Sequence, residues 1–417
     1  MNSSIIPLIE NNVTFSPYYF YNDFIKKVAD FYQNHEKEEK IQFRLALDSD
    51  FDFIGKNFFI DPISLPLLLS LSLQLKNYHK SPLSLFLSNN YGTVNIIEFL
   101  YRSDFFHLVG DNKNPTFPLG KNIFDYNEAY LGGFKGQGQR IEHKIRCYSI
   151  LDDNLQLKLN NILDEEAQRD FLVEHYTYKV KEHYGILLNE NDNTGNYTND
   201  FVEILAELIT NGVLHSKSDT FSLMFSDKYK TKFSISDSGI GLYDSLDKKN
   251  NNHFYKKFIL LNSLSQTFNL KVSEHIKLSL LAIFETLFYS MLKDRKGLFD
   301  LMCNVVINCG GYFRLHNNNA QVIISSRMLN DIQVLYETRA LILNTHNAIL
   351  FGQIPEKDFI IKMQELEAKS RQQIIQLATS IFKKFSQDVK FSSIRLFEVK
   401  FRGVHIEVEI PNSNNTK

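Results

Sequence analysis

Four polar side chains at four-residue intervals are the best placed for chemistry: Glu203, Glu207, Asn211 and His215. Residues four apart are neighbours on a helix surface, so these side chains form one polar stripe. The other side of the segment carries apolar residues at helical spacing and then a glycine: Phe201, Leu205, Leu208 and Gly212. Because polar groups in line are costly to bury without partners, the stripe is either a solvated helix face or the wall of a site.

An aspartate and two alternate glycines come later in the chain, in the run Asp237-Ser238-Gly239-Ile240-Gly241. Two segments with alternating apolar residues, 221–225 and 233–237, flank a polar turn at 227–230 and predict a β-hairpin. The aspartate then ends a strand, beside glycines whose backbone a ligand can approach closely. Alone, this run also fits an ordinary turn. Because the run follows the helix with the polar stripe, the two segments together indicate a binding site.

With both segments in this order the chain resembles the GHKL ATPases: gyrase B subunits, heat-shock chaperones, histidine kinases and anti-sigma-factor serine kinases. The first box of the last type, E-L-x-x-N-x-x-x-H, corresponds here to residues 207–215. The resemblance implies that Asn211 ligates a Mg²⁺ ion bridging the phosphates of ATP, with His215 completing the nucleotide box. It implies that Glu207 polarises the attacking water or hydroxyl. These roles agree with the chemistry, because Mg²⁺ takes few protein ligands and a general base needs a nearby carboxylate.

The same resemblance assigns the turn after the hairpin to the nucleotide base. It implies that Asp237 accepts the adenine amino group, while Gly239 and Gly241 let the backbone close on the nucleotide. Residues 243–293 stand where GHKL proteins place a lid, with a polar loop at 247–253.

A basic run then resembles the second glycine box, in which a helix start meets the phosphates. Lys293, Lys296 and Gly297 are its candidate nucleotide ligands, since a helix N-terminus with nearby cations favours polyphosphate. The alternative is a solvated turn. In the family a glycine pair and a strand come after that helix, and Gly310-Gly311 with the strand expected after them resemble this arrangement.

A strand of strictly alternating residues closes the predicted domain: Val404, Ile406, Val408 and Ile410, before Pro411. The family usually places a threonine after the glycine that begins this strand, and its hydroxyl assists the adenine site. Here Val404 follows Gly403, so that contact is missing or supplied elsewhere. Residues 326–393 are then an insertion. In it, apolar residues follow one face of a long helix starting near Pro355, a face expected to pack on its own domain.

The N-terminal segment alternates strands with helices, which suggests a parallel sheet. Expected strands lie at 41–47, 58–60 and 83–87, and expected helices at 65–75 and 94–100. The order resembles the STAS domain of anti-sigma-factor antagonists, which carries a phosphorylated serine in the turn after its central strand. Ser64 stands near that phosphosite, with Asp61 before it. The alternative, which we favour, is that Ser64 caps the helix.

Between these domains the pattern is weaker. The glycine-rich run 131–138 has no Lys-Ser/Thr after it, so a connector is favoured over a phosphate loop. Residues 152–184 indicate helices, and the polar run 189–199 indicates a loop.

The bulk composition is that of a soluble globular protein, with 43% hydrophobic and 23% charged residues. The net charge of −2 gives no reason to expect nucleic acid or a membrane surface as partner. Three cysteines without a C-x-x-C pair indicate buried thiols rather than a disulfide framework. The apolar run 278–292 contains Glu285 and predicts a core helix rather than a membrane span. No signal-peptide pattern begins the chain, so we expect a cytoplasmic protein.

The sequence thus predicts an α/β protein: a STAS-like domain (1–110), a connector (111–165), a GHKL ATP-binding domain (166–325), a helical insertion (326–393), and the last GHKL strand and tail (394–417). The GHKL domain is expected to be a mixed sheet covered by helices on one face. The first hypothesis is a Mg²⁺-dependent ATPase switch that controls a protein partner or a homodimer. The alternatives are an anti-sigma-type serine/threonine kinase and a nucleotide-sensing scaffold without turnover.

Overall fold

The computed structural model describes residues 5–36, 39–46, 58–87, 92–114, 116–134, 143–151, 155–216, 218–386 and 392–412. The fold is mixed α/β, as expected, with both parallel and antiparallel sheets. The chain divides into two compact units. The first is Met1–Asn160 with Ser218–Phe225 and Phe233–Ser238, and the second is Asn161–Lys217, Ser226–Lys232 and Gly239–Lys417.

The first unit contains a four-stranded parallel sheet in the order β1-β3-β5-β6. Its strands are β1 (Ile5–Pro7), β3 (Gln42–Arg44), β5 (Leu83–Phe86) and β6 (Phe124–Asp125). A separate short pair is formed by β2 (Thr14–Phe15) and β4 (Phe59–Ile60). The parallel sheet confirms the expectation from the strand–helix alternation, although the strands are shorter than their apolar patterns.

The helices of the first unit complete its core. They are α1 (Pro17–Tyr19), α2 (Ile25–Asn34), α3 (Leu65–His79), α4 (Val94–Arg102), α5 (Phe105–Val109) and α6 (Leu155–Asn160). Every residue from Leu65 to Leu73 is buried, as expected for a helix that is apolar on all sides. Leu85 of β5, Leu68 of α3 and Leu100 of α4 line one internal space, so strands and helices share a single core.

The predicted connector contributes regular structure to the first unit. It supplies β6 to the parallel sheet, and β7 (Arg146–Tyr148) pairs antiparallel with β8 (Thr220–Ser226). Glu128–Phe134 forms a short 3₁₀ helix, while the rest of the glycine-rich run lies outside the described residues. Pattern reasoning missed these strands because each is only two or three residues long.

A five-stranded sheet has the strand order β10-β11-β9-β8-β7. The predicted hairpin is confirmed as β8 and β9 (Lys230–Asp237), closed by a bond from the Asp227 N–H to the Lys230 carbonyl. The longest strands are β10 (Tyr312–Ser325) and β11 (Ile394–Pro411), paired antiparallel with Phe313 opposite Val408. The predicted closing strand is therefore confirmed, and it starts ten residues earlier than Val404.

The second unit is rich in helices. Those before the insertion are α7 (Glu165–Glu190), α8 (Asp192–Gly195), α9 (Thr198–Ser216), α10 (Leu242–Asp247), α11 (Ile259–Thr267), α12 (Glu274–Leu292) and α13 (Leu298–Cys303). The interpretation of 189–199 as a loop is wrong, because α8 and the start of α9 occupy most of it. The Asn191 side chain accepts a bond from the Asn193 N–H and donates to Thr231 Oγ1. The asparagines that suggested a loop are thus used as a cap and a tertiary contact.

Helix α12 is the central helix of the second unit. Among the described residues, it is the one helix long and apolar enough to cross a membrane. However, 61% of its 18-residue apolar stretch is buried inside the protein. This agrees with the prediction of a core helix. Its Glu285 is fully buried and accepts bonds from the Tyr255 hydroxyl (2.9 Å) and the Leu261 N–H (2.7 Å). Of the thiols, Cys303 and Cys309 are buried and Cys147 is partly exposed.

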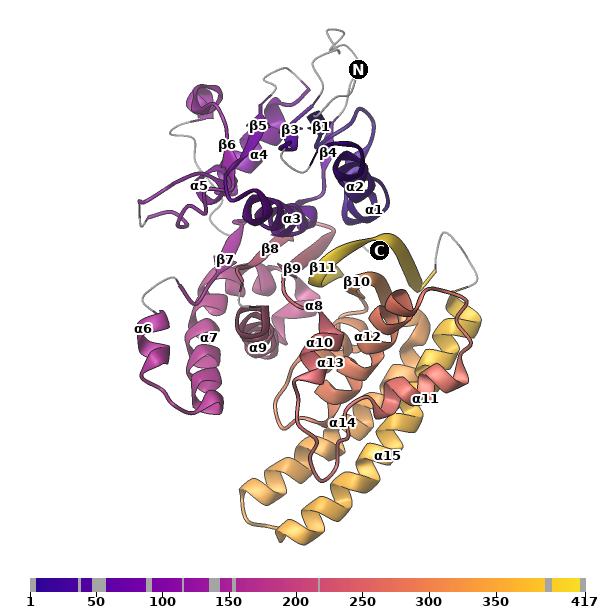
Figure 1. Ribbon diagram of the computed structural model, residues 1–417. Coiled ribbons are helices and arrows are strands. Elements are labelled where there is room, and N and C mark those ends of the chain that lie inside the picture. The colour runs from indigo at the N-terminus through magenta and orange to yellow at the C-terminus, as the bar shows by residue number, and fades with distance from the viewer. Residues whose placement is uncertain are drawn as a thin grey trace. The chain divides into compact units, whose positions relative to one another are not determined.

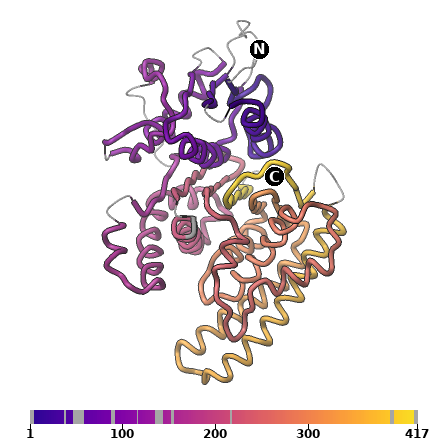
Figure 2. The backbone as a smooth tube through the Cα atoms, viewed as in Figure 1, coloured from indigo at the N-terminus to yellow at the C-terminus, as the bar shows by residue number. Residues whose placement is uncertain are grey.

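The insertion is a helical hairpin, α14 (Leu329–Leu350) followed by α15 (Glu356–Ser380). Figure 1 shows the two helices side by side, and the tube in Figure 2 follows the turn between them. The helix expected from Pro355 is confirmed. Its predicted apolar face is mostly buried, with Met363, Leu366 and Ile374 inside and α12 as a neighbour. That face therefore packs on its own domain; α14 was not predicted.

Candidate functional site

The polar stripe of α9 meets an arginine from α7. Glu207 is 4% exposed, and Arg169 is 6% exposed. The Arg169 Nη2 atom donates to Glu207 Oε1 and, over 3.1 Å, to Asn211 Oδ1. One guanidinium thus bridges the two residues that the sequence assigned to catalysis and to the metal. Sequence reasoning missed Arg169, whose helix was predicted but whose partners lie 38 and 42 residues away.

Two lysines stand close to Arg169. Burial, together with the charges of Arg169 and Lys249, lowers the pKa of Lys293 from 10.5 to about 7. Burial and the charge of Arg169 also lower the pKa of Lys249. Glu166 opposes both shifts. The mutual effects show three cationic groups near one another, so an anion bound among them would be stabilised.

Glu207 retains one carboxylate oxygen for other partners. Its Oε2 atom is buried and has no hydrogen-bond partner among the described residues. Gly297 lies beside it, since a Cβ at residue 297 would be 3.9 Å from Glu207 Cγ. The structure thus places Gly297 beside Glu207, and Lys293 near the Arg169 guanidinium that bridges Glu207 and Asn211. A buried carboxylate oxygen without a donor is costly, which marks the site as one that could take a ligand.

Lys296 lies at a different place from Lys293. Its ammonium forms ion pairs with Asp200 (2.8 Å) and Glu203 (3.1 Å) at the start of α9. Glu203, the first residue of the predicted stripe, is exposed. This end of the stripe is therefore a solvated face, whereas Glu207, one turn further along α9, is buried.

The segment 291–300, which leads into α13, is held by hydrogen bonds from an arginine of the insertion. Arg339 of α14 is 1% exposed and donates from Nε and Nη2 to the Asp300 carboxylate, each over 2.9 Å. It also donates to the carbonyls of Met291, Lys293 and Arg295. Asp300 in turn accepts the Gly297 N–H at the start of α13. The Gly297 N–H is thus already bonded to Asp300 within α13. Because Gly297 has no side chain, the space next to Glu207 stays open.

The turn after the hairpin is held by the two long strands. Gly241 has φ +84°, a left-handed backbone that favours glycine. Arg402 of β11 donates to the Gly239 carbonyl, and the Leu242 N–H donates to Asn317 Oδ1 of β10. Asp237 is the last residue of β9 and is buried. It belongs to the first compact unit, and both glycines belong to the second.

Two predicted residues, Ser64 and His215, are not among the residues brought together in the second unit, since Ser64 belongs to the first unit. Ser64 is fully buried at the N-cap position of α3, but its hydroxyl makes no capping bond and donates to the Phe15 and Asp61 carbonyls. A phosphoryl group could reach Ser64 only after those bonds opened. The His215 side chain lies outside the described residues. Among the described residues, no group of three or more His, Cys, Asp or Glu could hold a metal ion.

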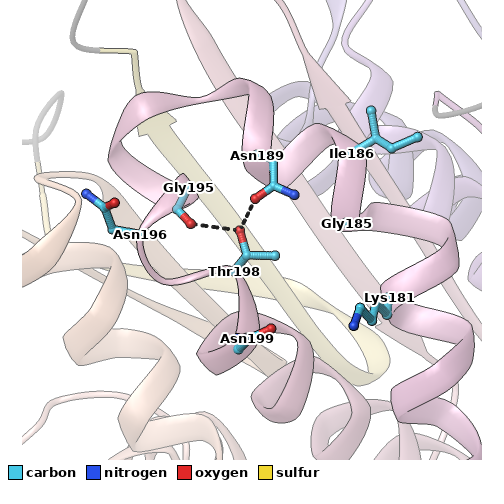
Figure 3. Close-up of a pocket in the computed structure, with 8 residues that line it drawn as sticks. All are labelled: Lys181, Gly185, Ile186, Asn189, Gly195, Asn196, Thr198 and Asn199. Atoms are coloured by element: carbon cyan, nitrogen blue, oxygen red, sulfur yellow. Dashed lines mark hydrogen bonds between the residues drawn. The ribbon is translucent and has the colours of Figure 1, made fainter.

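A separate surface cavity of about 390 Å³ lies where α7, α8 and α9 meet (Figure 3). Thr198 hydrogen-bonds across it to Asn189 Oδ1 (2.7 Å) and the Gly195 carbonyl (3.1 Å). None of the residues that the sequence singled out lines it. Most of its polar side chains are exposed, so it shows no chemistry comparable to that around Glu207.

No protein-family model, curated protein or solved structure matches the chain. The interpretation of the site therefore rests on its residues and their geometry.

Proposed function

We propose that the second unit binds Mg²⁺-ATP and works as an ATP-dependent signalling switch of the GHKL type. The observation that supports it is the buried Glu207 oxygen without a donor, beside three cationic groups and Gly297. A triphosphate would bring further negative charge to the three cationic groups Arg169, Lys249 and Lys293. A water or hydroxyl would supply the donor that Glu207 Oε2 lacks.

The residues present fit the proposed ligand, with one rearrangement. Asn211 Oδ1 is the oxygen that would ligate Mg²⁺, which prefers oxygen ligands, but it now accepts from Arg169. Arg169 would therefore move from the carboxylate and amide of α9 to the phosphates. Glu207, freed of its ion pair, would orient the attacking water or hydroxyl. Arg169 is part of the 26-residue helix α7. A movement of Arg169 would therefore couple nucleotide binding to the exposed face of α7, which a partner or second subunit could recognise.

The test compares two carboxylates of α9. Glu207→Gln should retain ATP, measured by calorimetry with Mg²⁺, and should lower hydrolysis by about 10²–10⁴-fold, the usual contribution of a general base. Glu203→Gln is the matched control, because Glu203 is exposed and forms its ion pair with Lys296, away from the Arg169 guanidinium; it should hydrolyse like the parent. Equal hydrolysis by Glu207→Gln and the parent would reject the role of Glu207. Absence of ATP binding by the parent would reject the function.

A scaffold without turnover is a second candidate, favoured by one observation: Arg169 occupies both Glu207 and Asn211. If Arg169 stays there with ATP bound, the base remains neutralised. The parent would then bind ATP without releasing phosphate, and Arg169→Met would change affinity without creating turnover. The kinase alternative requires phosphoserine or phosphothreonine on this chain or a partner after incubation with ATP, and free phosphate alone would reject it. The cytoplasmic location and the protein partner or homodimer stay predictions.

A further inference from the structure

Asn318 of β10 is a buried amide in an irregular part of the sheet. The pairing of β10 with β11 shifts register on both sides of Asn318, and its φ is +54°. Asparagine tolerates this left-handed backbone better than most residues. The side chain is 8% exposed, and its Oδ1 atom has no hydrogen-bond partner among the described residues. A buried oxygen without a donor is costly, and a ligand that donates a hydrogen bond to it would remove that cost.

The neighbouring asparagines show the contrast. Asn317 Oδ1 accepts the Leu242 N–H, and its Nδ2 donates to the Ser279 carbonyl. Asn319 Nδ2 donates to the Phe397 carbonyl. Both amides hold one part of the second unit to another. Only Asn318, of these three consecutive residues, has a buried oxygen without a donor.

The Asn318 amide lies against the glycine turn. A Cβ built on Gly241 would be 2.6 Å from Asn318 Nδ2 and 3.1 Å from Asn317 Oδ1. Gly241 therefore needs to be glycine both for its positive φ and for the space that these amides occupy. Asn317 is also the partner of Val404 in the β10–β11 register. The amide of Asn318 thus comes from the strand beside the position where the expected threonine is missing.

We propose that Asn318 contacts the base of the nucleotide and supplies the contact that Val404 cannot make. Its Oδ1 accepts an N–H of the base, such as the amino group of adenine, and the same amide can donate to a ring nitrogen. An amide can pair in this two-bond manner with adenine because donor and acceptor alternate on both. This inference rests on the proposed nucleotide function and adds a specificity-determining residue to it.

The test separates the base from the phosphates by using two probes, ATP and inorganic tripolyphosphate, on the full chain. Asn318→Gly keeps the backbone conformation available and removes the amide. It should weaken ATP about tenfold, the value of one or two hydrogen bonds, and leave tripolyphosphate unchanged. Asn318→Asp keeps an acceptor oxygen at a backbone that Asp also tolerates and should bind ATP within about threefold of the parent. Asn319→Ala is the control, with the parent's ratio of ATP to tripolyphosphate affinity.

Each result decides one question. Selective loss of ATP in Asn318→Gly, with recovery in Asn318→Asp, supports the base contact. Unchanged ATP affinity in Asn318→Gly, or equal loss of both probes with a folded circular-dichroism spectrum, overturns it. If the parent binds neither probe, the proposed function itself fails; if the parent binds both and only the Asn318 prediction fails, the proposed function stands without this residue.

Discussion

Replacing Arg339 by methionine should lower the free energy of unfolding more than the loss of an exposed ion pair does. The guanidinium is 1% exposed, forms two bonds of 2.9 Å to Asp300 and donates to several carbonyls of the segment before α13. Methionine fills much of the same space but donates nothing. The Asp300 carboxylate, 8% exposed, would then keep the bond that it accepts from the Gly297 N–H and lose both bonds from the guanidinium.

The expected loss of stability follows from the difference between removing one charge of a buried ion pair and removing both. Breaking one by removing a single partner costs about 3–5 kcal/mol, because the other charge stays buried. Since about 1.4 kcal/mol is tenfold, the unfolding equilibrium constant should rise by roughly two to three and a half decades. Removing both charges restores part of this, because an apolar pair of similar volume is often neutral. Arg339→Met with Asp300→Asn should therefore be more stable than Arg339→Met alone.

Urea unfolding followed by circular dichroism at the helix band is the assay, since the chain has no tryptophan for fluorescence. Lys257→Met is the control in the same unit. Its ion pair with Asp247 is exposed, with side chains 34% and 60% accessible, and such pairs contribute about 0–1 kcal/mol. A loss below about 1 kcal/mol in Arg339→Met, equal to the control, would show that Arg339 does not hold the segment before α13.

Three other side chains of the second unit, Glu285 and Met363, which are buried, and Lys293, which is partly buried, give further predictions. Lys293 has a folded pKa of about 7 and an unfolded value near 10.5, so the unfolded chain holds more protons between those pH values and unfolding free energy should rise with pH there; denaturation of Lys293→Met across pH 7–10 should give a flatter profile, and identical slopes would contradict the burial of this ammonium. Glu285→Ala leaves the Leu261 N–H without its acceptor at a cost of about 1–3 kcal/mol, and hydrogen exchange at the start of α11 should accelerate; unchanged protection would refute the anchoring role. Met363→Ala in the hairpin should cost about 2–5 kcal/mol, whereas Ile361→Ala, 47% exposed, should stay within about 0.5 kcal/mol; equal losses would mean that the buried face is assigned wrongly.

Local periodicity carried much of the fold. The α9 helix, the β8–β9 hairpin, the closing strand β11 and helix α3 all follow from side-chain patterns a few residues long, because helix and strand periods appear directly in the order of residues. The parallel sheet of the first unit follows from the alternation of such elements. Short strands such as β6 carry too few residues to show a period.

Composition misled at the asparagine-rich run before α9. Asparagine is typical of loops because its side chain bonds to nearby backbone. The Asn191 side chain does bond the nearby Asn193 N–H, but there it caps α8, and its amide nitrogen also lies 3.4 Å from the Ile410 carbonyl, 219 residues away. The same side-chain bonding that is typical of loops therefore caps the start of α8 and contacts strand β11.

The sequence by itself determined that a carboxylate and an amide stand one turn apart on α9, because that relation depends only on helix geometry. It also determined the glycines at 239 and 241. Only the tertiary structure decided that Arg169 bridges Glu207 and Asn211, that Arg339 holds the segment before α13, and that Asn318 lies against Gly241. These partners come from different helices and strands, and no local period relates them. Packing brings them together, and the low polarity of the interior makes each such contact decisive.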